Sequence, residues 1–175
     1  IGFTFLEMSI ILEWGGITVE KSGTGIFPLS DVGGSIRSGR LTALVGPSGS
    51  GKTLLLESLS GRVDGIGAKS GVVLDAKLRL DSSEARRNHI GFVSCKEELI
   101  GSVTPREGLE FNAALNGHNS SVDFYLTLLD LEACADTPFA QLSDATQKRL
   151  TTIACEMINE RTILLLDAPL TSLSQ

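Results

Sequence analysis

Continuous apolar runs mark two segments of the chain as buried strands. Residues 41–45 (Leu-Thr-Ala-Leu-Val) end at Gly46, and residues 162–166 (Thr-Ile-Leu-Leu-Leu) end at Asp167. Strands that are covered on both faces carry apolar residues in succession, whereas half-exposed strands alternate. The pattern therefore predicts two parallel strands, at 41–45 and 162–166.

The N-terminal part is expected to add further strands. Residues 1–14 are apolar, but Glu7 and Glu13 interrupt them, and they fall short of the ~20 residues that cross a bilayer, so we expect a core strand. Residues 14–41 are rich in Gly and Ser with scattered Val and Ile, which is typical of short antiparallel strands joined by turns.

Helical periodicity appears in four segments. Residues 52–60 have one apolar face followed by a helix stop, formed by Leu55, Leu56 and Leu59 and then Gly61. A second helix is predicted from Thr104-Pro-Arg-Glu, a capping box with proline at the first helical position. Ser120-Ser-Val-Asp repeats the signal more weakly for a third helix.

The fourth predicted helix starts near Ser143. We expect Ser143 to cap it, with Asp144 in its first turn, where a negative charge is favoured. Its apolar face is more typical of core than of a ligand site and comprises Leu150, Ile153, Ala154, Met157 and Ile158.

Together these elements predict one α/β domain, a mixed sheet core with an inserted helical subdomain. The core comprises residues 1–100 and 161–175, and the helical subdomain comprises residues 101–160. A chain of 175 residues can bury its own core as a single domain. Because the sequence opens on Ile1 rather than methionine and stops at Gln175 directly after a strand and loop, we expect a piece of a longer protein.

The net charge and the cysteine content argue against some classes of function. Fifteen basic and 21 acidic residues give a formal charge of −6, which repels phosphodiester backbones, so we expect no nucleic-acid partner. The three cysteines, Cys95, Cys134 and Cys155, are widely spaced and form no Cys-x-x-Cys pair for zinc. A reducing compartment fits this usage best.

A glycine-rich segment joins the first predicted parallel strand to the first predicted helix. It matches the P-loop pattern G-x-x-x-x-G-K-S/T and comprises Gly46, Pro47, Ser48, Gly49, Ser50, Gly51, Lys52 and Thr53. Glycines let the loop curl until successive N–H groups point at an anion, and the helix N-terminus adds a favourable dipole. Lys52 is expected to contact the β- and γ-phosphates, and Thr53 and Asp167 to hold Mg²⁺. A surface Gly-Ser loop that happens to contain Lys-Thr is the alternative.

The residues around and between these motifs resemble ABC transporter nucleotide-binding domains of the G subfamily, the white and pleiotropic-drug-resistance group. Residues 39–62 around the P-loop carry the closest likeness, and Gly91-Phe-Val looks like the strand before the family's Q-loop. Residues 103–111 are similar to the entry of its helical subdomain, and residues 164–174 resemble Walker B running into the D-loop. The family's signature motif is matched by residues 142–149, beginning Leu142, Ser143, Asp144, Ala145 and Thr146.

This resemblance implies a P-loop NTPase of ABC type that binds ATP and Mg²⁺. It also implies a head-to-tail pair with a second nucleotide-binding domain, either a copy or a different chain, and coupling to a transmembrane domain at the cytoplasmic face of a membrane. The family's base-stacking aromatic corresponds to Val19 here, so weak discrimination between ATP and GTP is expected. His89 and His118 precede Walker B and do not match the family's switch histidine.

The sequence departs from the family's pattern at four places. Ala168 stands where the catalytic glutamate follows the Walker B aspartate, and Cys95 stands at the Q-loop glutamine. Asp144 and Ala145 replace the two signature glycines, and Ser174 replaces the D-loop aspartate. We therefore expect an ATP-binding domain whose hydrolysis is weak or lost. A non-catalytic ATP-sensing or scaffolding module, a non-functional fragment, and a soluble ATPase of DNA repair or translation remain alternatives, the last disfavoured by the acidic charge.

Overall fold

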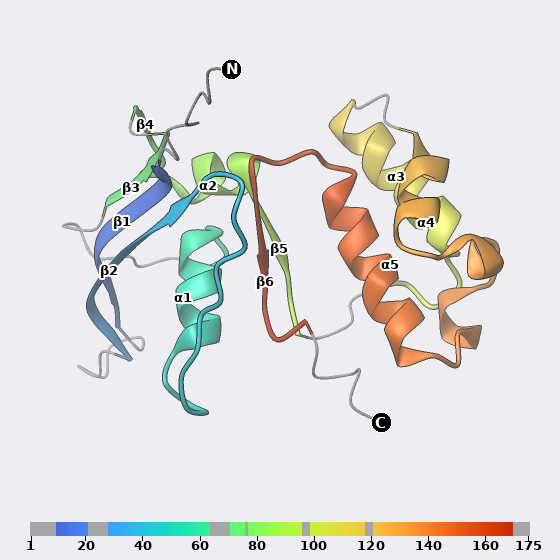
Figure 1. The fold of residues 1–175 in the computed structure, drawn as a ribbon, viewed down its shortest axis with the longest axis horizontal. Helices are drawn as coiled ribbons and strands as arrows, with labels where there is room; N and C mark the ends of the chain where they lie inside the picture. Colours follow the sequence, from blue (N-terminus) through green and yellow to red (C-terminus); the bar gives the residue numbers. More distant parts are fainter. Residues whose placement is uncertain are drawn as a thin grey trace, which may run out of the picture. The chain divides into compact units, whose positions relative to one another are not determined.

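The chain forms two compact units, residues 1–87 and 88–175 (Figure 1). The structure, a computed structural model, describes residues 10–20, 28–63, 71–75, 77–95, 99–117 and 121–169. The residues predicted as strand at 1–9 therefore lie outside the described part.

The first unit contains an antiparallel sheet. Its strands are β1 (Ile10–Val19), β2 (Leu29–Arg37), β3 (Gly71–Leu74) and β4 (Leu78–Arg79), in the order β2-β1-β3-β4. Pairing is antiparallel throughout, with register shifts between β1 and β2. The apolar residues of this sheet that are buried are Leu12, Ile17, Val19, Leu29, Val72 and Leu74. The antiparallel strands predicted for residues 14–41 are thus confirmed, and the first begins earlier, at Ile10.

Two helices begin in the first unit. Helix α1 (Lys52–Leu59) buries Leu55 and Leu59, as its apolar face predicts. It ends before Gly61, which adopts a left-handed φ of 75°. A side chain at this glycine would meet the carbonyl oxygen of Ser83, the first residue of α2 (Ser83–His89), at 2.4 Å. Arg87 Nη1 donates to the Gly61 carbonyl oxygen at 2.6 Å, so the end of α1 is held against α2.

The prediction of a strand at residues 41–45 is wrong. These residues form no strand, and Leu41 and Val45 are 96% and 84% exposed. An apolar run indicates a tendency to be buried, but a strand also needs a neighbour for its N–H and C=O groups. Among the described strands, none pairs with residues 41–45.

The second unit is built on a parallel strand pair. Strands β5 (Ile90–Val93) and β6 (Ile163–Leu166) pair from Ile90↔Ile163 to Val93↔Leu166. This confirms the strand predicted to end at Asp167 and the strand expected at Gly91-Phe-Val. Of β6, however, only Ile163 is buried, so the expectation of a strand covered on both faces is wrong for it. The described strands therefore combine antiparallel and parallel pairing, as expected of a mixed α/β core.

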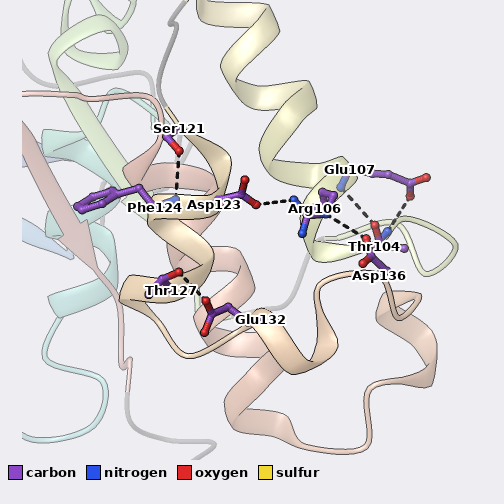
Figure 2. A network of polar contacts seen from close by, with 9 residues as sticks. All are labelled: Thr104, Arg106, Glu107, Ser121, Asp123, Phe124, Thr127, Glu132 and Asp136. Atoms are coloured by element: carbon purple, nitrogen blue, oxygen red, sulfur yellow. Dashed lines mark hydrogen bonds and ion pairs between the residues drawn. The ribbon is translucent and has the colours of Figure 1, made fainter.

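Helices account for most of the rest of the second unit. Helix α3 (Pro105–Asn116) begins with the predicted capping box, and Ser121 caps α4 (Val122–Leu128) by accepting from the Phe124 N–H (Figure 2). Arg106 of α3 donates to Asp123 at 2.7 Å and to Asp136 at 3.1 Å. Two short 3-10 helices follow, η1 (Glu132–Cys134) and η2 (Phe139–Gln141). Arg106 thus connects the start of α3 to α4 and to the segment after η1.

Helix α5 (Ala145–Met157) lies between the strand pair and helices α3 and α4 (Figure 1). Of its predicted apolar stripe, Ala154 and Ile158 are fully buried and Leu150 packs partly against the same core. The buried face also includes residues outside the stripe, namely Arg149, Thr151 and Cys155. No helix in the described ranges is long and apolar enough to cross a membrane.

Candidate functional site

The P-loop turns sharply into α1 in the first unit. Gly51 is the N-cap of α1 and adopts a left-handed conformation with φ 85°, and Gly49 has φ 79°. A Cβ at Gly51 would lie 2.9 Å from Leu29 Cδ2, a side-chain end that can shift, so it is the left-handed backbone that favours glycine there. The loop therefore takes its shape from the two glycines that the sequence placed at these points.

Lys52 folds back over the loop that precedes it. Its Nζ donates to the carbonyl oxygens of Gly46 at 2.9 Å and Pro47 at 2.7 Å, and to Ser50 Oγ at 3.4 Å. The ammonium is thus held beside the first turn of α1. This turn has no side-chain cap and no acidic residue, so its N–H groups and dipole add to the positive potential.

A second group of predicted site residues lies at the ends of β5 and β6. Asp167 directly follows β6, is 5% exposed, and donates its N–H to the Val93 carbonyl oxygen at 2.9 Å. Ala168 follows with φ 44°, an uncommon conformation for a residue with a side chain. Cys95, two residues after β5, is exposed.

Arg149 joins these two strand ends, and the sequence did not single it out. The side chain reaches from α5, is 3% exposed, and donates from Nη2 to the Asp167 carbonyl oxygen at 2.7 Å and from Nη1 to that of Ser94. Its spacing was only a partial signal: Arg149 lies four residues before Ile153, at the edge of the predicted apolar stripe, and a charge buried there needs hydrogen-bond partners.

The signature segment precedes and opens α5. Leu142 is buried, Ser143, Asp144 and Ala145 are exposed, and Thr146 is half-buried. The expectation that Ser143 caps the helix is wrong: Asp144 is the N-cap, and its Oδ1 accepts from the Thr146 N–H at 2.7 Å. Ser and Asp are comparable caps, so the sequence alone could not choose between them. The Asp144 carboxylate therefore occupies an N–H group at the start of α5.

The structure also shows where Val19, the residue at the family's base-stacking position, lies. Val19 is 5% exposed and pairs with Leu29 between β1 and β2, so its side chain belongs to the core of the first unit. The P-loop belongs to this unit, whereas Asp167, Ala168, Cys95 and residues 142–146 belong to the second.

The donor set of the P-loop fits a phosphate chain. An uncapped helix N-terminus, left-handed glycines and an ammonium held within the loop all favour anionic oxygens. In the described part of the chain, no three His, Cys, Asp or Glu side chains cluster as metal ligands. Mg²⁺ in phosphate sites takes one or two protein ligands and completes its shell with phosphates and water, and a hydroxyl and a carboxylate such as Thr53 and Asp167 match that need.

Comparison with protein families matches residues 29–171 to the family described as ABC transporter. The chain is 33% identical to ABC transporter G family member 13 of Arabidopsis thaliana, over 95% of this chain and 26% of that protein. It is 31% identical to Broad substrate specificity ATP-binding cassette transporter ABCG2 of Sus scrofa, over 89% of this chain and 24% of that protein. It therefore spans about a quarter of these relatives' length.

A solved structure supports the same fold. The "Structure of ATP binding subunit of ABC transporter" superposes with a TM-score of 0.74 at 22% identity, covering 93% of this chain and 68% of the solved chain. At this identity the similarity concerns the fold, which is the P-loop α/β fold of ABC type.

Proposed function

The chain belongs to the ABC transporter family, as an ATP-binding domain with G-family relatives, and from this premise we propose that it binds Mg-ATP on residues 46–53 and hydrolyses it slowly or not at all. The observation that carries the proposal is the arrangement of Lys52 beside the uncapped first turn of α1. When a nucleotide binds, oxygens of its β- and γ-phosphates would replace the loop carbonyl oxygens as hydrogen-bond partners of the Lys52 ammonium. The N–H groups of the loop would bind the remaining oxygens.

Mg²⁺ binding is the next part of the proposal. The Thr53 hydroxyl and the Asp167 carboxylate are the side chains of this chain that would hold the ion. Mg²⁺, when bound, neutralises charge on the phosphates. Asp167 suits this role because it directly follows β6, is itself buried, and has its N–H bonded to Val93.

Weak hydrolysis follows from the residues at the strand ends. Ala168 has no group to accept a proton from an attacking water, and a positioned base contributes about 10²–10⁴-fold to rate. Cys95 offers no amide to orient that water. The side chains that would activate water are therefore absent at both positions where the family places them.

Asp144 weakens the other half of a paired site. In the family's head-to-tail pair, a signature segment faces the γ-phosphate bound by the partner domain. Here the Asp144 carboxylate occupies the Thr146 N–H that an anion would use. A carboxylate ~5 Å from a phosphate oxygen costs about 3 kcal/mol per unit charge at an effective dielectric near 20.

We further propose that the chain pairs with a second nucleotide-binding domain and drives a transmembrane domain at the cytoplasmic face of a membrane. Support comes from its relatives, whose names describe transporters. An ATP-sensing or scaffolding module is the disfavoured alternative, and it would bind ATP in the same loop without driving transport.

Thermal unfolding with and without Mg-ATP tests the binding proposal. A ligand that binds only the folded state stabilises it by about 2.7 kcal/mol at 100 Kd, so the unaltered protein should melt at higher temperature with millimolar Mg-ATP. Lys52→Ala should abolish the shift. Lys77→Ala removes one exposed charge from the same unit and serves as the matched control. The proposal fails if Mg-ATP produces no shift in the unaltered protein, or an equal shift in Lys52→Ala.

A further inference from the structure

The Arg149 side chain bridges the ends of β5 and β6. Its Nη2 donates to the Asp167 carbonyl oxygen at 2.7 Å, and its Nη1 donates to the Ser94 carbonyl oxygen. Ser94 directly follows β5 and Asp167 directly follows β6, and these strands are paired up to Val93↔Leu166. The guanidinium therefore extends the connection between the strands by one residue beyond their last pair.

Burial of the Arg149 guanidinium favours keeping both of its hydrogen bonds. Arg149 is 3% exposed, and a buried charge is costly unless hydrogen bonds satisfy it. The guanidinium is a planar fork with fixed donor directions, so it can hold two carbonyl oxygens at once. Both described partners are main-chain oxygens, so these bonds act on the path of the backbone.

The bond to Asp167 acts on the peptide group that leads into Ala168. The Asp167 carbonyl and the Ala168 nitrogen share one peptide plane, and Ala168 has the disfavoured φ of 44°. Such a conformation persists only where the surroundings hold it. Arg149 from α5 and the Asp167 N–H bond to Val93 supply two such constraints on either side of the Asp167 Cα.

We propose that Arg149 is a positioning residue that holds the Asp167–Ala168 peptide in this orientation and thereby aims the Asp167 carboxylate at Mg²⁺. This inference rests on the proposed Mg-ATP function. Arg149 itself touches neither the ion nor the nucleotide. Because residues that orient metal ligands strongly influence metal affinity, its effect should appear in the Mg²⁺ dependence of ATP binding rather than in ATP binding as such.

Two measurements on the intact protein test this role, with Arg149→Lys as the main variant. Lysine keeps the positive charge, but its three donors sit on one nitrogen and do not reproduce the planar fork. Arg106→Lys is the matched control, since it makes the same exchange at a guanidinium whose bonds go to Asp123 and Asp136. Arg149→Gln, which keeps a planar donor without the charge, replaces Arg149→Lys if that variant does not fold.

Hydrogen exchange is the first measurement. Arg149→Lys should speed exchange of the Asp167 and Ala168 amides by about tenfold relative to the amides of Ile163–Leu166, because it loses a charged hydrogen bond at that point. Arg106→Lys should leave this ratio unchanged. Uniform acceleration along β6 in Arg149→Lys would show general destabilisation and overturn the proposal.

The affinity for ATP with Mg²⁺ and with EDTA is the second measurement. Arg149→Lys should reduce the tightening produced by Mg²⁺ by about tenfold and leave the affinity in EDTA nearly unchanged. Equal losses in both conditions, or an intact Mg²⁺ effect, refute the positioning role while leaving nucleotide binding in place. Failure of the unaltered protein to bind Mg-ATP instead refutes the proposed function, and the positioning role with it.

Discussion

Thr104 and Glu107 exchange two hydrogen bonds across the first turn of α3. Thr104 Oγ1 accepts from the Glu107 N–H at 3.2 Å, and Glu107 Oε2 accepts from the Thr104 N–H at 2.9 Å (Figure 2). Thr104→Ala should lower the free energy of unfolding by about 1 kcal/mol, the usual cost of losing an N-cap. Urea unfolding measures this, and Thr104→Ser should retain most of the stability. An equal loss in both variants would contradict the capping explanation.

Gly61 should tolerate alanine poorly. A Cβ there would lie 2.4 Å from the Ser83 carbonyl oxygen, in addition to the left-handed φ of 75°. Gly39 is the matched control, because it has φ 67° with no atom within 4 Å of a Cβ. Gly39→Ala should cost about 1–2 kcal/mol from backbone strain alone, and Gly61→Ala clearly more, since α2 must move. Equal costs in urea unfolding would show that the contact with α2 is unimportant.

The stability of the chain should fall at alkaline pH through Cys155. Burial, with a smaller contribution from the Glu156 carboxylate, raises the pKa of this thiol from 9.0 to about 12. Above pH 9 the unfolded chain loses the proton while the folded chain keeps it, so stability decreases as pH rises, by up to about 1.4 kcal/mol per unit until the folded thiol also ionises near pH 12.

Unfolding free energies of the unaltered protein and Cys155→Ala, compared between pH 8 and 11, isolate this contribution. The variant should show a shallower decline with pH. Identical slopes would mean that Cys155 is not buried as described. Thiol labelling gives an independent check: Cys95 is exposed and should react in the folded protein, whereas Cys134 and Cys155 are buried and should react only after unfolding.

The chain should discriminate only weakly between the bases of ATP and GTP. Val19, at the position that the family resemblance gives to a stacking aromatic, is buried in the sheet of the first unit. We expect the Kd values for Mg-ATP and Mg-GTP to differ by less than about tenfold, or 1.4 kcal/mol. Direct titration of each nucleotide measures the ratio. A much larger preference would show that another contact recognises the base.

Repair of hydrolysis should require changes at two places. In the proposed head-to-tail pair, Ala168 would affect the site on this chain's own P-loop, whereas Asp144 and Ala145 would affect the site on the partner's P-loop. In a homodimer each composite site would contain both defects, so Ala168→Glu alone should restore little turnover. Glutamate adds no new backbone strain, because alanine already carries a Cβ at φ 44°. Adding Asp144→Gly and Ala145→Gly should raise the rate by more than the product of the separate effects.

A heterodimer with an intact partner reverses that expectation. The partner then supplies a normal signature, so Ala168→Glu alone should activate the site on this chain's P-loop. Steady-state ATPase rates of the single and combined variants, with and without a candidate partner, decide between these cases. Full turnover of an Ala168→Glu homodimer would show that Asp144 is no obstacle at the phosphate.

The sequence by itself determined the features that depend on near neighbours. The capping box of Thr104 and Glu107, the glycines of the P-loop and the helix stop at Gly61 act over a few residues, so local rules identify them. The apolar run before Asp167 also predicted its parallel strand, although the same kind of run at residues 41–45 forms no strand.

Only the tertiary structure decided the features that need distant partners. Residues 41–45 have the composition of a strand, yet pairing depends on a neighbouring strand that composition does not specify. The choice of Asp144 over Ser143 as the cap depends on where the preceding chain places two equally suitable side chains. Arg149 meets Ser94 and Asp167 across 55 and 18 residues of sequence, and hydrogen bonds of this range arise only when packing of α5 has brought the strand ends within reach.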